Sequence, residues 1–377
     1  SFGVSMLVCV SAKPLLFIVK LIHQNVSRTI FLKFILGQFF VDTCSFWVSY
    51  HLLIIMSLRQ IDFSKVLSDD QVYDHMMANY EQLGRDWIVH QWNWMNNTYA
   101  AFKDHYKYLI IISLVEKTLQ FYDQMNIQYT FDQFYSKSNL QIDKFSITEL
   151  CEKLQLPKET IRRKVLELEE LGVLKRQKKQ IIIDRSVFPQ IKPERQVRSS
   201  SKYIHLISEV LNNEKIYSKK LDYKMIENTI KKNFSICWRW FYRMQIPIVI
   251  GYHDMFEDVA TFHIWGTIAM NQAFNYKSTN VESLTPDYSN FNKGLIEGKG
   301  SESGVSAMSI SDMTTIPRAT VIRKCKYLMK NNYIKLNEKK QYVLTGFNTR
   351  AVLPYQREIF KNKAKFLRKI LNLITIS

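Results

Sequence analysis

One stretch of this chain of 377 residues occurs twice. When the chain is shifted by 160 positions, residues 150–176 fall on residues 310–336 without a gap. One extra residue in the later loop moves the shift to 161, and 178–180 then fall on 339–341. A unit that is built twice predicts two similar modules. The positions that keep their residue are Pro157 and Pro317, Thr160 and Thr320, Arg163 and Arg323, Lys164 and Lys324, Leu168 and Leu328, and Lys175 and Lys335.

The first copy reads as helix, turn, helix and two strands. A short helix carries Leu150 and Leu154, and Pro157 opens a second helix, where its missing N–H costs nothing. Ile161, Val165 and Leu168 recur at i, i+4 and i+7, which predicts one buried stripe. Gly172 then ends the helix in a left-handed conformation. Residues 173–175 and 181–183 are predicted strands around a basic tip at 176–179.

The second copy repeats the same order of elements. Val321, Cys325 and Leu328 form the predicted buried stripe of its second helix. The pair Asn331-Asn332 replaces the glycine cap. Residues 333–335 and 341–344 are the predicted strands, around a tip at 337–340.

This order of elements resembles the winged helix-turn-helix of bacterial transcription regulators. The pattern IxxxxxIPRxTVxRxxxxLxxxxxI is similar to that of MarR-like proteins, and the resemblance covers about 40 residues in each copy. It implies that the second helix enters the DNA major groove and that the wing touches the backbone or the minor groove. In the first copy it would place at DNA the helix residues Lys158, Glu159, Thr160, Arg162 and Arg163 and the wing residues Lys175, Arg176, Lys178 and Lys179. In the second copy the corresponding residues are Arg318, Ala319, Thr320, Ile322 and Arg323 in the helix and Lys335, Lys339 and Lys340 in the wing.

Positive charge is confined to two blocks that begin at these helices. The chain carries a net charge of +18, while residues 158–202 carry +7 and residues 318–369 carry +13. The rest of the chain is therefore slightly acidic, which a uniform bias in composition would not produce. Double-stranded DNA is the polyanion that two such modules would bind. Two half-sites about one helical turn apart, ~34–36 Å, would suit them. Arg162 aligns with Ile322, and Glu159 aligns with Ala319, so the half-sites need not be identical.

The fold class expected is mainly α (α+β), with two winged helix-turn-helix domains, each preceded by aromatic-rich helices. A possible echo of Trp92-x-Trp94 in Trp238-x-Trp240 extends the repeat upstream. Aromatic clusters such as Trp87, Trp92 and Trp94 are expected in the core, with a ligand pocket or a dimer surface as the alternative. The expected divisions are an apolar segment 1–55; a helical segment with the first winged helix, 56–188 (core 145–184); a linker 189–201; a helical segment 202–275; a flexible loop 276–306; the second winged helix 307–345; and a basic C-terminal helix 346–377.

Residues 1–55 are apolar but carry Lys13, Lys20, Arg28, Lys33 and Asp42. The longest uncharged run, 43–58, is shorter than the ~20 apolar residues that span a membrane. We expect translated upstream sequence before a true start at Met56. A genuine helical segment and a membrane anchor are the alternatives.

Catalytic and metal motifs are weak. The five cysteines are scattered without a CxxC pair, which favours a reducing compartment. His253 and Glu257, at i, i+4, and nearby Asp254, Asp258 and His263 are the best candidate ligands, but no second matching set accompanies them. We expect no enzyme activity, cofactor or metal.

The sequence thus predicts a cytoplasmic, nucleoid-associated DNA-binding protein that regulates transcription. Plasmid and phage replication initiators, which also join two winged helices, are one alternative. A scaffold whose winged helices bind proteins is another, favoured for the first copy by Glu167, Glu169 and Glu170. A small-molecule effector is possible but unnamed, a membrane partner is not expected, and the sequence leaves monomer and homodimer open.

Overall fold

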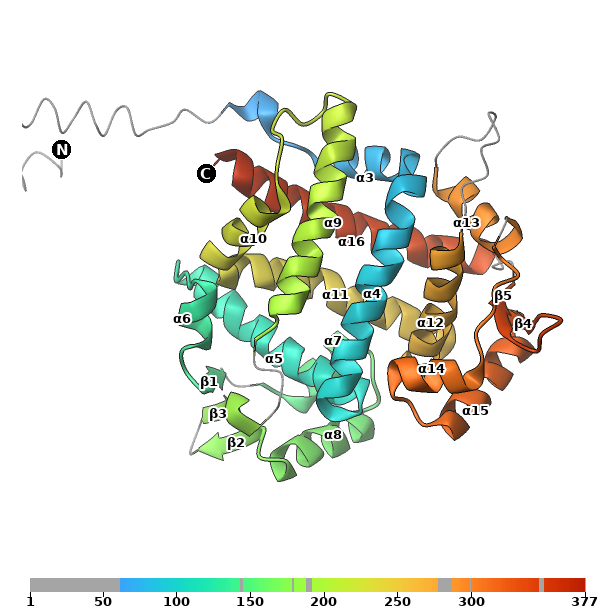
Figure 1. The fold of residues 1–377 in the computed structure, drawn as a ribbon. Coiled ribbons are helices and arrows are strands. Elements are labelled where there is room, and N and C mark those ends of the chain that lie inside the picture. The colour runs from blue at the N-terminus through green and yellow to red at the C-terminus, as the bar shows by residue number, and fades with distance from the viewer. Residues whose placement is uncertain are drawn as a thin grey trace, which may run out of the picture. The chain divides into compact units, whose positions relative to one another are not determined.

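Helices form most of the structure, a computed structural model that describes residues 62–142, 145–177, 180–187, 192–276, 287–298, 300–345 and 349–376 (Figure 1). The prediction of a mainly α chain is confirmed. Only eleven glycines and eight prolines interrupt the chain, so long helical runs are possible. The predictions for residues 1–55 lie outside the described residues.

The chain enters through a short 3-10 turn, η2 (Phe63–Lys65), and four helices. Ser68 opens the first helix with a capping box, and Asp104 caps the third by accepting bonds from two backbone N–H groups. The helices are α3 (Asp69–Ala78), α4 (Tyr80–Phe102), α5 (His105–Gln124) and α6 (Phe131–Tyr135).

The first predicted helix-turn-helix is present. Its helices are α7 (Ile147–Leu154) and α8 (Lys158–Glu170), with Gln155 left-handed between them and Pro157 at the N-cap of α8. Gly172 has φ +71°, as the predicted cap requires. The strands β2 (Leu174–Gln177) and β3 (Gln180–Asp184) pair antiparallel, and the 3-10 turn η3 (Arg185–Val187) follows. A third strand, β1 (Asn139–Ile142), pairs with β3 and was not predicted.

The predicted linker at 189–201 is wrong from Glu194 onward, because helix α9 (Glu194–Asn213) begins there. Pro193 stands at the N-cap of this helix rather than in a hinge. Ser200 and Ser201 are buried, and Ser201 Oγ donates to the Val197 carbonyl 2.8 Å away. Helix α9 packs on both α4 and α10, so this segment is part of the packed structure.

The middle of the chain is helical as predicted. It forms α10 (Tyr223–Lys232), α11 (Phe234–Phe256) and α12 (Val259–Asn275). The predicted flexible loop at 276–306 is wrong over α13 (Tyr288–Glu297), while 277–286 lie outside the described residues. Gly294 serves packing here, since a Cβ at this position would meet the Tyr276 ring at 2.6 Å.

The second predicted helix-turn-helix region folds into α14 (Ala307–Thr314) and α15 (Arg318–Lys330), followed by β4 (Ile334–Leu336) and β5 (Tyr342–Leu344). Asn332 is left-handed, as the predicted cap requires. The C-terminal helix α16 (Thr349–Ile376) agrees with the prediction for 346–377, and it packs on α3 and α11.

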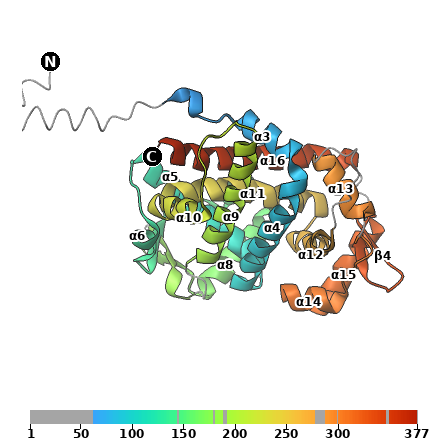
Figure 2. The ribbon, with the colours of Figure 1, turned by 45° about the horizontal axis from the view of Figure 1, so that its top comes forward.

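Residues 63–377 form a single unit rather than separate domains. Long central helices α4, α11, α9 and α16 hold it together, and α8 and α15 lie toward the same end, below them in Figure 1. Figure 2 shows α16 running along the opposite edge. No helix within the described ranges is both long and apolar enough to cross a bilayer.

Candidate nucleic-acid interface

The exposed face of α8 carries the predicted cations. Ile161, Val165 and Leu168 are buried, as the stripe predicts. Lys158, Glu159, Arg162 and Arg163 are exposed, and Thr160 is half-buried. The arginine side chains have only loose intrahelical partners, with Arg162 Nη1 4.0 Å from Glu159 Oε2 and Arg163 Nε 3.8 Å from Glu167 Oε1. Exposed pairs of this kind are weak, so both guanidinium groups are available to a ligand.

Helix α15 presents the corresponding face. Arg318, Ala319 and Arg323 are exposed, whereas Thr320 and Ile322 are half-buried. Val321, Cys325 and Leu328 are fully buried. Burial raises the pKa of the Cys325 thiol to about 12, so this cysteine is a core residue and no nucleophile.

An ion pair that the sequence did not predict fixes each of these helices. Lys164 Nζ lies 2.6 Å from Oδ2 of Asp104, the N-cap of α5. Lys324 Nζ lies 2.8 Å from Oδ2 of Asp258, the N-cap of α12. Burial alone would raise the pKa of the Asp258 carboxyl, but Lys324 and Thr261 together lower it. The lysine that follows each outward arginine thus turns inward; only the alignment of Lys164 with Lys324 hinted at it.

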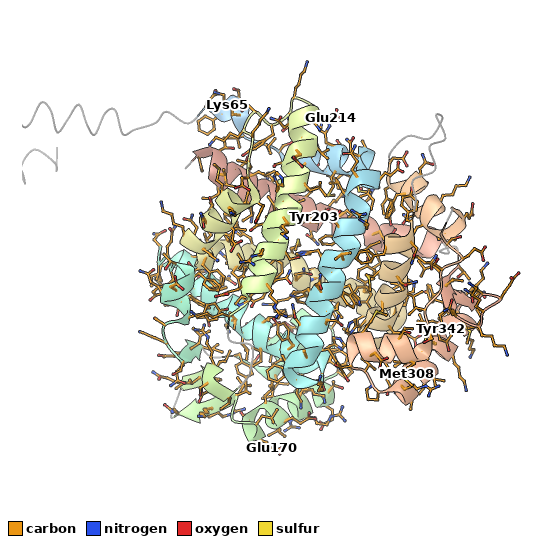
Figure 3. The ribbon with its side chains drawn as sticks, viewed as in Figure 1. Lys65, Glu170, Tyr203, Glu214, Met308 and Tyr342 are labelled. Carbon is orange, nitrogen blue, oxygen red and sulfur yellow. The ribbon has the colours of Figure 1, made fainter. Side chains whose placement is uncertain are left out.

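Two of the three glutamates at the acidic end of α8 are paired within the protein. Glu167 Oε2 lies 2.8 Å from Lys107 Nζ and 3.0 Å from Lys164 Nζ, which lowers the pKa of its carboxyl. Glu169 pairs with Arg176 at 2.5 Å. Glu167 is also the loose partner of Arg163, whereas no ion pair joins Glu167 or Glu169 to Lys158 or Arg162 among the described residues. Figure 3 shows Glu170, the last residue of α8, at the end of the molecule opposite to Glu214.

The two predicted wings differ in charge. In the first, Lys175 Nζ contacts Asp184 Oδ2 at 2.6 Å and holds the pKa of that carboxyl near 2. Arg176 is held by Glu169, and Lys178 and Lys179 lie outside the described residues. In the second wing Lys335, Lys339 and Lys340 are all exposed. Among the described residues, no carboxylate lies within 4.0 Å of any of these three lysines.

The His253 group is not assembled into a site. His263 is buried against His105 and Asn96, at 3.1 and 2.8 Å, and Asp258 is engaged by Lys324. His253 Nδ1 lies 3.3 Å from Oδ1 of its neighbour Asp254, and its ring packs edge-on against Tyr106 with ring centroids 6.0 Å apart. Within the described part of the chain, no three His, Cys, Asp or Glu side chains come close enough to hold a metal ion.

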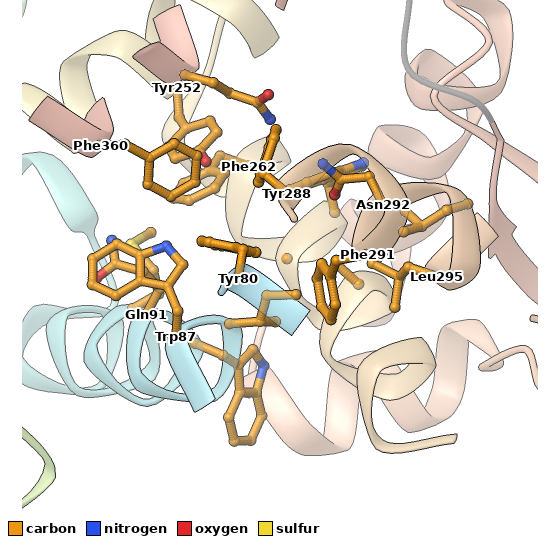
Figure 4. A pocket seen from close by; sticks show the side chains of 18 of the residues that line it. Tyr80, Trp87, Gln91, Tyr252, Phe262, Tyr288, Phe291, Asn292, Leu295 and Phe360 are labelled. Carbon is orange, nitrogen blue, oxygen red and sulfur yellow. The ribbon is translucent and has the colours of Figure 1, made fainter. Parts of the chain in front are cut away.

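The aromatic residues form a core with a small cavity of about 70 Å³ between α4, α12, α13 and α16 (Figure 4). Tyr80, Trp87, Phe262 and Phe291 are among the side chains that line it. Beside it, Lys363 is fully buried, with its Nζ 4.0 Å from the centre of the Trp87 ring. The prediction of core positions is confirmed for Trp87 and Trp94, whereas Trp92 is half-buried and lines the cavity.

Comparison with known proteins identifies one region. Residues 140–180 match the DeoR-like helix-turn-helix domain. This range runs from β1 through α7, α8 and β2 to the start of β3, and its helix α8 carries Arg162 and Arg163 on the surface. Neither the curated proteins nor the solved structures contain a match to the chain. The match supports the first module as a helix-turn-helix that binds DNA.

Proposed function

We propose that this protein is a sequence-specific, double-stranded DNA-binding regulator of transcription that uses two winged helices in one chain. The observation that carries the proposal is that the DeoR-like match falls on α7 and α8, whose exposed face is cationic. The MarR-like character of both modules and an action at the nucleoid belong to the same proposal.

The second winged helix is inferred from its likeness to the first. Helices α14 and α15 have the lengths of α7 and α8, with bounds 160 residues later. From 151 to 170 and from 311 to 330, the order of buried, half-buried and exposed positions differs only where Ile322 replaces Arg162. Val305 pairs with Tyr342 of β5, which corresponds to the pairing of β1 with β3 in the first module. A shared burial pattern favours a shared mode of ligand contact.

The chemistry of the two helices suits a DNA groove. A recognition helix brings its N-terminal residues to base edges and phosphates. Arg162 can donate two hydrogen bonds to guanine, while Thr160 and Thr320 suit phosphate contacts at the helix N-termini. The half-buried Ile322 offers an apolar contact to a thymine methyl group. The two modules would therefore share phosphate contacts but differ in the bases that they read.

Selection of duplexes from a random pool by the full-length protein tests the proposal, followed by titrations at several salt concentrations. We expect an enriched sequence and an affinity that falls steeply with salt. Arg163→Ala and Arg323→Ala should weaken binding to every duplex, and Arg162→Ala should change preference at a few bases. Lys220→Ala, an exposed cation between α9 and α10, is the matched control and should change nothing. Salt-independent affinity, or arginine variants that bind like the control, would contradict the proposal.

A further inference from the structure

The equivalence extends beyond the winged helices to two halves of the chain, one from α3 to α9 and the other from α10 to α16. Helix α10 begins 154 residues after α3, and α11 begins 154 residues after α4, with equal lengths in each pair. The same offset relates the N-cap residues Asp104 and Asp258. The echo of Trp92-x-Trp94 in Trp238-x-Trp240 has an offset of 146, so that predicted pairing is wrong by about two helical turns.

The last helices of the halves correspond as well. In α9, Tyr203 contacts Trp87 of α4 with ring centroids 5.5 Å apart. In α16, Phe366 contacts Phe241 of α11 at 5.9 Å, and Phe241 lies 154 residues after Trp87. With this pairing, the buried and exposed positions of 196–208 match those of 359–371 one for one. Each half is therefore one arrangement of helices, winged helix and closing helix.

The contacts between the halves are reciprocal. Helix α4 packs on α12, and its counterpart α11 packs on α5, the counterpart of α12. Helix α9 packs on α10, and α16 packs on α3. The first residue of α11, Phe234, meets Phe131 of α6 at 5.0 Å, while the first residue of α4, Tyr80, meets Phe291 of α13 at 5.5 Å. If a translation related the halves, a contact from the first half to the second would have no return contact from the second half to the first. A two-fold axis produces both contacts of each pair.

Two equivalent glutamines mark the axis. Gln91 and Gln245 occupy the same position of α4 and α11, and both are buried. Gln245 Nε2 donates to Gln91 Oε1 at 2.8 Å. A residue can touch its own counterpart only where the symmetry axis passes close by. The bond therefore places a pseudo-two-fold axis through the contact of α4 with α11.

We infer that one chain binds a DNA site whose two half-sites are inverted, in the manner of a symmetric dimer, and this inference rests on the proposed function. A two-fold relation presents α8 and α15 to one duplex in opposite senses, so the dyad of the protein coincides with that of the DNA. Both helices lie toward one end of the unit, with the two wings on its opposite sides (Figure 1). Because Ile322 occupies the position in α15 that Arg162 occupies in α8, the site is an imperfect palindrome.

The shared residues make the orientation of each half-site measurable. Arg163 with Arg323, and Thr160 with Thr320, would contact equivalent positions, so the two half-sites should share part of their sequence. From the selected site, a second duplex is made in which one half-site is turned round at unchanged spacing, giving a direct repeat. The full-length protein is titrated with both duplexes, and the number of chains per duplex is measured by native mass spectrometry.

We expect one chain per duplex and an affinity at least ten-fold lower for the direct repeat, because its second half-site no longer engages α15. Arg323→Ala, which removes a shared contact of the second module, should reduce this difference. Equal affinity for the two arrangements, or two chains on one site, would overturn the inference while leaving DNA binding intact. Failure to enrich any duplex would instead overturn the proposed function, and this inference with it.

Discussion

Removal of one wing lysine should change the salt dependence of DNA binding in the second module more than in the first. Lys175 and Lys335 occupy equivalent strand positions, opposite Ile182 and Val343. Asp184 holds Lys175 at 2.6 Å, but Thr345 takes the place of Asp184 in the second wing. Lys335 is therefore an unpaired cation among the described residues, free to neutralise a phosphate.

The expected magnitude follows from counterion release. Each phosphate contact contributes ~0.9 to the slope of log affinity against log salt. We expect Lys335→Ala to reduce that slope by about 0.9, so that a rise from 50 to 200 mM salt costs ~3.5-fold less affinity than in the unaltered protein. Lys175→Ala should reduce the slope by clearly less, because Lys175 is already engaged by Asp184.

The assay is fluorescence anisotropy with one selected duplex at four or more salt concentrations. Thermal unfolding of each variant controls for damage to the fold. If Lys175→Ala and Lys335→Ala reduce the slope equally, pairing with Asp184 does not determine which wing cations contact DNA. If Lys335→Ala leaves the slope unchanged, the second wing does not contact phosphates.

Three further predictions concern the axis and the core. Gln91→Leu should lower the free energy of unfolding, measured by chemical denaturation, by about 1–3 kcal/mol because it leaves the buried Gln245 amide unpaired. The double variant Gln91→Leu with Gln245→Leu should recover most of that loss, and additive losses would show that the two amides do not interact. Burial lowers the pKa of His105 to about 4 and that of His263 well below its usual value, so the folded state disfavours protonation. Stability should therefore fall below pH 6.5 by about 1.4 kcal/mol per pH unit for each histidine, and a flat pH profile from 6.5 to 4.5 would refute this. Burial also lowers the pKa of Lys363, so the unaltered protein should gain stability as the pH rises toward 10. Lys363→Met should remove this gain and raise the melting temperature at pH 7. An unchanged or lower melting temperature would mean that the surrounding rings compensate fully for the buried charge.

Local sequence predicted the helix-turn-helix regions closely, because periodicity, caps and turn residues act over short distances there. Ile161, Val165 and Leu168 are buried as expected. Gly172 and Asn332 adopt the left-handed conformation expected just after the ends of α8 and α15. These features depend on 3.6-residue periodicity and on backbone sterics, both of which can be read from a single segment.

Long-range packing escaped prediction. The serine-rich segment before Lys202 reads as a linker by composition, but Ser200 and Ser201 are buried and Ser199 Oγ lies 3.0 Å from His90 Nδ1 of α4. The ion pairs of Lys164 and Lys324 join residues some 60 positions apart, so no local pattern reveals them. The reciprocal contacts of the two halves likewise link elements that share few identical residues.

Hydroxyl-radical footprinting of the selected duplex, at one full-length chain per duplex, tests the central claim most directly. Two DNA-binding modules related by a two-fold axis predict two protected segments about one helical turn apart, placed symmetrically on the two strands about a common centre. A single protected segment, unaffected by Arg323→Ala, would contradict the claim that both modules bind DNA.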